Sequence, residues 1–224
     1  METFTYKEIL QQPSCWIKEY EVLLEEKTRI QAFLEKYLTN ETDIVLTGAG
    51  TSAFIGDAIA PLLRGVWKNV RAVATTDIVT NAADYLVADK PLLLISFARS
   101  GNSPESVAAV NLANAICKNV AHIYITCNKN GHLAQSANAE NILSLLLPEE
   151  TDDKSLAMTS SFSTMLLTCL MISQIDHIEA ERERIEAVAA NAQAVLSDYA
   201  GAIEAIAARP FERGVFLGSG PMKG

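Results

Sequence analysis

PLLLISFARSGNSPES, residues 91–106, combines a buried strand, a hydroxyl-rich loop and the start of a helix. The apolar run Leu92–Ile95 has the length and purity of a strand that is buried on both faces of a sheet. Ser103, Pro104 and Glu105 then supply an N-cap, a first-turn proline and a first-turn acid, which together are typical of a helix start. The segment therefore predicts a strand, a loop and a helix in succession.

The loop of this segment has the composition of an anion-binding turn. Backbone N–H groups, the positive end of the helix dipole and several hydroxyl donors converge there, and such groups hold phosphate without a cluster of lysines. The polar and small residues are Ser96, Ser100, Gly101, Asn102 and Ser103. From this segment alone, a phosphate-binding loop and an ordinary capped helix both remain open.

A second loop of the same kind lies earlier in the chain. A predicted strand over Asp43–Leu46 runs directly into TGAGTS, residues 47–52. Thr51 and Ser52, which follow Gly50, suit a phosphate or a sugar hydroxyl. Two hydroxyl-rich loops at neighbouring strand ends favour a single phosphorylated small molecule.

The glycines of this second loop also match the dinucleotide fingerprint G-x-G-x-x-A over Gly48–Ala53. However, the next predicted strand, Val70–Val73, ends without an acid that would bind a ribose hydroxyl. A Rossmann-type oxidoreductase is therefore kept as a competing hypothesis, and it requires tight dinucleotide binding. Neither a Walker A motif nor a nucleophile elbow is present in the sequence.

Strands and helices alternate along the chain in a pattern that favours a parallel sheet wrapped by helices. Strands are expected at 43–46, 70–73, 92–95, 122–126 and 141–146, and helices at 53–63, 77–85, from 104 onward, 156–175 and 178–208. Residues 5–38 are expected to form a helical arm in two pieces, split at Pro13 with Ser14 as the second cap. In open sheets of this kind, ligands bind at the carboxyl ends of the strands, where both loops fall.

Composition excludes several classes of partner. The 224 residues include 18 basic and 27 acidic side chains and no basic run, so nucleic acid and anionic membranes are poor candidates. Four scattered cysteines lack zinc-site spacing and are expected to be reduced thiols in a cytoplasmic protein. Residues 155–175 carry no charge, but their eight hydroxyls favour a buried helix over a membrane span.

Other polar residues have weaker signals. Arg99 is the only cation in the opening segment, and it is expected either to contact a ligand oxygen or to pair with Glu105 or Asp153. Residues 152–154 are expected to form a solvated loop. Thr159 and Ser160 belong to a third hydroxyl cluster that would cap the following helix or close over a sugar, and the three histidines are expected to be structural.

The last residues repeat the pattern of the first strand and loop. GVFLGSG, residues 214–220, resembles DIVLTGAG, residues 43–50, because each has a short apolar run followed by a G-x-G loop. This partial repeat predicts that the chain is the front part of a longer protein with two related α/β halves.

Four motifs carry a family resemblance: GAGTS (48–52), SFARSGNSPES (96–106), ITCN (125–128) and AMTSSF (157–162). In this order they resemble the sugar isomerase (SIS) domain, and more closely the bacterial tagatose-6-phosphate ketose/aldose isomerases, also described as galactosamine-6-phosphate deaminase/isomerases. The resemblance covers nearly the whole chain. It implies a flavodoxin-like three-layer α/β sandwich with a five-stranded parallel sheet, which follows the N-terminal helical arm in this chain. It also implies a homodimer or higher oligomer, a phosphorylated sugar as partner, and neither cofactor nor metal.

The resemblance also implies site residues. In the isomerase half of glucosamine-6-phosphate synthase, the loops that match Gly50–Ser52 and Arg99–Ser103 hold the sugar phosphate and nearby hydroxyls. Ser100 and Ser103 are the first candidates for phosphate, whereas Arg99 stands where the synthase has an uncharged glutamine. The predicted substrate-binding residues are Gly50, Thr51, Ser52, Arg99, Ser100, Gly101, Asn102, Ser103, Thr159 and Ser160.

The implied domain division is a helical arm at 1–40, a first SIS domain at 41–176, a helical connector at 177–212 and the start of a second SIS domain at 213–224. In two-domain relatives the glutamate and histidine that move protons come from the second SIS domain, so the catalytic residues are expected outside this chain. The implied reaction converts galactosamine 6-phosphate to tagatose 6-phosphate and ammonia. A non-catalytic sugar-phosphate regulator is the alternative from another class.

Overall fold

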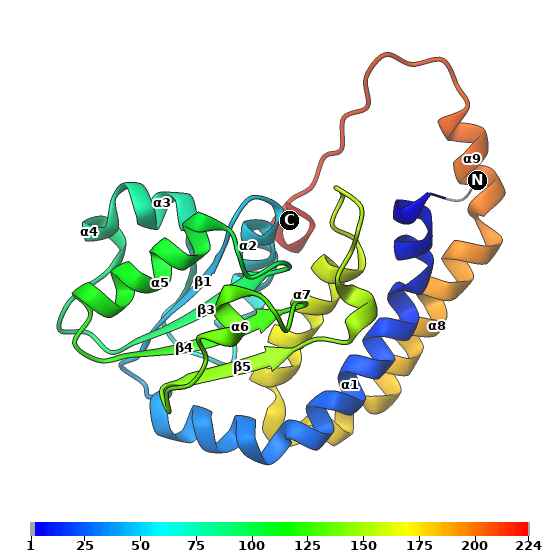
Figure 1. The fold of residues 1–224 in the computed structure, drawn as a ribbon. Coiled ribbons are helices and arrows are strands. Elements are labelled where there is room, and N and C mark those ends of the chain that lie inside the picture. Colours follow the sequence, from blue (N-terminus) through cyan, green and yellow to red (C-terminus); the bar gives the residue numbers. More distant parts are fainter. Residues whose placement is uncertain (1–2, 224) are drawn as a thin grey trace.

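A five-stranded parallel sheet forms the middle layer of the computed structural model, which describes residues 3–223 (Figure 1). The strands follow the spatial order β2-β1-β3-β4-β5. They are β1 (Asp43–Gly48), β2 (Val70–Ala72), β3 (Leu92–Ala98), β4 (Val120–Thr126) and β5 (Ile142–Leu146). The α/β class, the five parallel strands and the flavodoxin-like strand order are therefore confirmed.

Helices cover both faces of this sheet (Figure 1). They are α1 (Phe4–Tyr37), α2 (Thr51–Leu63), α3 (Thr75–Thr80), α4 (Ala82–Tyr85), α5 (Pro104–Ile116), α6 (His132–Gln135), α7 (Ser160–Ser173), α8 (Arg182–Asp198) and α9 (Ala200–Ala207). The described residues also form the 3-10 turns η1 (Glu149–Thr151), η2 (Ile175–Glu181) and η3 (Gly220–Lys223). Among residues 3–223, no helix is both long enough and apolar enough to cross a membrane.

Strand β3 shows why its sequence is a continuous apolar run. Leu93 and Ile95 belong to a core cluster with residues of α1, α2 and α7. Leu92 and Leu94 point to the opposite face and pack with residues of α3 and α5. Because side chains alternate along a strand and both faces are covered, every position of this strand must be apolar or small.

Helix α1 runs without interruption through Pro13, so the prediction of two pieces capped at Ser14 is wrong. Proline has no N–H to donate to the carbonyl one turn earlier, which here belongs to Ile9. The side-chain amide of Gln12 donates to that carbonyl over 3.1 Å and replaces the missing bond. The continuous helix packs beside α7 and α8 (Figure 1).

The uncharged segment forms α7, which is shorter than the predicted 156–175 and starts at Ser160. Met165, Cys169 and Ile172 on this helix are fully buried in the core cluster that includes α1. The expectation of a buried helix is confirmed.

The predicted strand over 214–217 is not formed, because these residues have no strand beside them in the described chain. The following loop nevertheless repeats the first one in shape. Gly220 and Gly50 both have a φ of 56°, and the amide of Met222 donates to the carbonyl of Ser219 over 3.1 Å. The amide of Ser52 makes the equivalent bond over 3.2 Å. The domain boundaries remain a prediction.

Candidate functional site

A small pocket lies at the carboxyl ends of β1 and β3, which are neighbours in the sheet. The helices that follow these two strands, α2 and α5, pack on opposite faces, so the two loops diverge and leave a crevice. The pocket has a volume of about 140 Å³. Its lining residues are Ala49, Ser52, Phe97, Ala98, Arg99, Ser100, Ser103, Ser106 and Met158.

The first wall is the tight turn between β1 and α2. Gly48 is required there because a Cβ at this position would lie 2.6 Å from the backbone of Ser52. The turn places the Ser52 hydroxyl in the pocket, buried and 3.8 Å from the sulfur of Met158. Thr51 begins α2 and is exposed, and neither Thr51 nor Gly50 lines the pocket.

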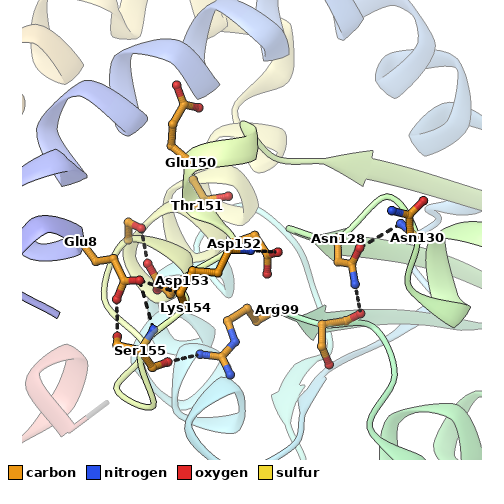
Figure 2. A network of polar contacts seen from close by, with 12 residues as sticks. Glu8, Arg99, Asn128, Asn130, Glu150, Thr151, Asp152, Asp153, Lys154 and Ser155 are labelled. Atoms are coloured by element: carbon orange, nitrogen blue, oxygen red, sulfur yellow. Dashed lines mark hydrogen bonds and ion pairs between the residues drawn. The ribbon is translucent and has the colours of Figure 1, made fainter. Parts of the chain in front are cut away.

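The second wall is the loop between β3 and α5. Gly101 has a φ of 66°, which an L-residue with a side chain rarely adopts. The side chain of Asn128 donates to the carbonyl of Ser100 over 3.1 Å (Figure 2). The amide of His132 donates to the side-chain oxygen of Asn102 over 2.8 Å. The loop after β4 therefore fixes the shape of this wall, and Gly101 and Asn102 support the pocket without lining it.

Two serine hydroxyls meet at the start of α5. Ser103 occupies the N-cap position, as predicted, but its side chain makes no hydrogen bond to a backbone amide. Its hydroxyl instead lies 2.6 Å from the hydroxyl of Ser106, and both residues line the pocket. The positive end of the helix dipole thus faces the pocket with hydroxyl donors beside it.

Arg99 lies at the edge of the pocket. Its Nη1 donates to the carbonyl of Ser155 over 2.9 Å (Figure 2). Within residues 3–223, no ion pair is formed between Arg99 and a carboxylate, so the expected alternatives, pairing with Glu105 or Asp153, are wrong. A guanidinium without a carboxylate partner is suited to a phosphate or sugar oxygen.

The third wall is the loop before α7, and Met158 is its contribution to the pocket. Glu8 of α1 holds this loop (Figure 2). Its Oε1 accepts from the amide of Lys154 over 2.5 Å and from the amide of Ser155 over 3.1 Å, and its Oε2 accepts from the Ser155 hydroxyl. The loop that carries Met158 is therefore anchored to α1.

Asp153 is buried, so the expectation of a solvated loop over residues 152–154 is wrong at this residue, whereas Lys154 is exposed. Its carboxylate accepts from the amides of Thr159 and Ser161, each over 2.9 Å, and from the hydroxyls of Ser160 and Ser161. Thr159 and Ser160 are therefore engaged in starting α7, and neither lines the pocket.

Burial shifts the pKa values of several titratable groups, among them His122, Cys127 and Cys15. Burial lowers the pKa of His122 to about 4, and its Nε2 lies 3.0 Å from the side-chain oxygen of Asn114. Burial also raises the pKa of the Cys127 thiol to about 12 and that of the Cys15 thiol to about 11. None of these residues lines the pocket, and the described residues contain no cluster of three or more metal-binding side chains.

The structure thus brings together four of the predicted residues, Ser52, Arg99, Ser100 and Ser103. Sequence reasoning missed Ser106 and Met158. Ser106 follows Ser103 by three residues, which is one helical turn, so its spacing was a usable signal. Met158 had no such signal, since it reaches the pocket from a loop that α1 holds.

Comparison with known proteins agrees with the family resemblance of the sequence motifs. Residues 37–173 match the SIS domain family. A D-galactosamine-6-phosphate deaminase AgaS from Escherichia coli is 47% identical over 99% of this chain and 58% of its own length. The crystal structure of tagatose-6-phosphate ketose/aldose isomerase from Escherichia coli has a TM-score of 0.87 at 46% identity, covering 93% of this chain and 57% of that one.

A more distant structure shares the fold alone. The C-terminal domain of glucosamine-fructose-6-phosphate aminotransferase from Francisella tularensis has a TM-score of 0.74 at 17% identity, over 92% of this chain and 59% of that one. The chain spans a little over half the length of the curated relatives that it matches, 58% in the E. coli deaminase. Because the matched family region covers more than half of the chain, this chain belongs to the SIS domain family.

Proposed function

We propose that this chain is the phosphate-binding part of an enzyme that converts galactosamine 6-phosphate to tagatose 6-phosphate and ammonia. The observation that carries the proposal is the pocket at the ends of β1 and β3, where serine hydroxyls, the Arg99 guanidinium and the start of α5 converge. The names of the E. coli relatives support the choice of sugar and reaction.

The size of the pocket supports a role in holding one group of the substrate. At about 140 Å³ it has room for roughly five waters of about 30 Å³ each, whereas pockets for whole small molecules have about 300–1,000 Å³. A phosphate group fits this space, and the sugar then extends outward past Arg99 and Met158. Its proposed ligands are Ser52, Arg99, Ser100 and Ser103, and the further predicted residues are Thr51, Gly50, Gly101, Asn102, Thr159 and Ser160.

The chemistry requires groups that the pocket does not supply. Loss of the amine proceeds through ring opening, removal of the C2 proton by a general base, protonation at C1 and hydrolysis of the imine at C2. Among the described residues, those that line the pocket carry no carboxylate and no imidazole. We therefore assign phosphate binding to this chain and proton transfer to residues outside it. A soluble cytoplasmic homo-oligomer with two SIS domains per subunit is part of the same proposal.

The test is to incubate the full-length protein with galactosamine 6-phosphate and to measure ammonia and tagatose 6-phosphate. Release of both is expected, and glucosamine 6-phosphate is the matched substrate control for the stereochemistry at C4. Saturable binding of the sugar phosphate with no ammonia released would instead indicate a non-catalytic regulator. A melting temperature that rises with nicotinamide cofactors alone would contradict the phosphosugar assignment.

A further inference from the structure

The N-terminal helix reaches the candidate site through one buried carboxylate. Glu8 lies near the start of α1 and is only 5% exposed. Burying a carboxylate is costly unless hydrogen bonds compensate it. Among the described residues, the groups that donate to Glu8 are the amides of Lys154 and Ser155 and the Ser155 hydroxyl, and they belong to one loop. The N-terminal helical arm thus holds a wall of the pocket.

The loop transmits this anchorage to the pocket in two ways. Ser155, which Glu8 holds by its amide and hydroxyl, uses its carbonyl to accept from Nη1 of Arg99 (Figure 2). Three residues later, Met158 lines the pocket, and its sulfur lies 3.8 Å from the Ser52 hydroxyl. Displacing Ser155 therefore moves the guanidinium and the third wall together.

The loop is held at its two ends, whereas its tip at Leu156 is exposed. Leu156 is 97% exposed, so it contributes no packing that would hold the loop in place. The side-chain amide of Gln11 donates to the carbonyl of Glu150 over 2.8 Å and to the hydroxyl of Ser160 over 2.9 Å, which ties the two ends of the loop. Glu8 is the α1 side chain that holds the middle of the loop.

We propose that Glu8 is a positioning residue for the phosphate group, acting through Ser155 on Arg99. This inference rests on the proposed function, because it assigns Arg99 to the ligand. It requires a carboxylate, since both of its oxygens accept hydrogen bonds. A glutamine at position 8 keeps one oxygen for the two amides, but it is neutral and its NH₂ replaces the oxygen that accepts from the Ser155 hydroxyl, so the hold on Ser155 is weakened.

The first measurement needs no ligand. Hydrogen exchange of the amides of Lys154 and Ser155, followed by mass spectrometry on the full chain, is expected to be faster in Glu8→Gln than in the wild type. Glu25→Gln is the matched control, because Glu25 is an exposed acid on the same helix. Unchanged exchange at the loop in Glu8→Gln would overturn the proposal.

The second measurement is a double-mutant cycle on binding, with galactosamine 6-phosphate and with inorganic phosphate as ligands in calorimetry. Glu8→Gln is expected to weaken binding by about tenfold in the wild-type background, which is the size of one charged hydrogen bond. In the Arg99→Met background the same substitution is expected to change binding less than about twofold, because its target is gone. Equal losses in both backgrounds would show that Glu8 does not act through Arg99, and would overturn the proposal.

Two further arms keep the test decisive. If Glu8→Gln does not fold, Glu8→Asp keeps the charge but shortens the reach by one methylene, and the same cycle applies to it. If the wild type binds neither ligand, the proposed function fails. Hydrogen exchange and a crystal structure of the variant then decide separately whether Glu8 holds Ser155 and Arg99 in place.

Discussion

The hydroxyl oxygens of Ser103 and Ser106 lie 2.6 Å apart at the first turn of α5. Two hydroxyl groups carry two protons, and the bond between them uses one. The second proton is free to point into the pocket that both residues line. A bound phosphate would thus receive a hydroxyl donor that is already oriented by its neighbour.

Ser103→Ala is therefore expected to weaken the binding of galactosamine 6-phosphate by about tenfold or more. A hydrogen bond to a charged group contributes roughly 1.5–3 kcal/mol, and the alanine also leaves Ser106 without its partner. Calorimetric titration checks this, with Ser197→Ala on the exposed face of α8 as the control. Wild-type affinity in Ser103→Ala would remove Ser103 from the proposed ligands.

Gly48→Ala is expected to destabilise the protein by several kcal/mol. The added Cβ would lie 2.6 Å from the backbone of Ser52, so the turn that forms the first wall must open. Gly201→Ala is the matched control, because a Cβ at Gly201 in α9 meets no atom within 4 Å and favours the helix. Urea denaturation of both variants gives the comparison, and equal stability of the two would contradict the steric argument.

Asp153→Asn is expected to lower the free energy of unfolding by about 1–3 kcal/mol. The carboxylate accepts from two amides and two hydroxyls at the start of α7, and an amide nitrogen in place of one oxygen would face donors. The adjacent Asp152 is more exposed and pairs with Lys154, so Asp152→Asn should change stability by less than about 0.5 kcal/mol. Chemical denaturation of both variants measures this difference. Similar losses of unfolding free energy in the two variants would contradict the role of Asp153 at the start of α7.

Glu19 makes the stability of the protein depend on pH. Burial raises the pKa of this carboxyl to about 8. The hydroxyl of Thr168 lies 2.8 Å from both the Thr164 carbonyl and Oε1 of Glu19. The Thr168 hydroxyl donates to Oε1, which lowers the pKa of Glu19 and opposes the larger effect of burial.

The sign of the effect follows from proton binding. Between the ordinary pKa of about 4.5 and the raised value of about 8, the folded state binds more protons than the unfolded state, so stability falls as pH rises. Glu19→Gln removes this loss of stability. The free energy of unfolding of the variant is expected to exceed that of the wild type by a few kcal/mol at pH 9, and the difference should shrink toward pH 5. Thermal unfolding across this range is the measurement. A pH-independent difference would contradict the assignment of the proton to Glu19.

Much of the fold could be predicted because its signals are local. The run Leu92–Ile95 and the small residues after it occur in adjacent positions, so the strand, the loop and the start of α5 could be identified without the rest of the chain. The same local pattern gave a wrong strand prediction at 214–217. A strand also needs a neighbouring strand for its backbone hydrogen bonds, and the described chain provides none there. Local composition indicates which residues favour a strand but does not supply a partner.

The candidate site could be predicted only in part for the same physical reason. Ser52, Ser100 and Ser103 lie in loops that directly follow strands, so topology alone brings them together. Glu8 and Met158 depend on contacts between α1 and residues about 150 positions later, which no spacing in the sequence reveals. Pro13 was misjudged because Gln12 replaces the bond that proline removes.

The bond between Glu8 and the amide of Lys154 spans 146 positions of the chain and has a consequence for synthesis. Ribosomes add about 5–20 residues per second, so α1 emerges roughly 7–30 seconds before the loop that it anchors. Throughout that interval the apolar side of α1 has no α7 to cover it, and the β3 loop has no third wall. The phosphate pocket therefore forms only after the loop before α7 has been synthesised, and α1 is made well before the partners that it holds.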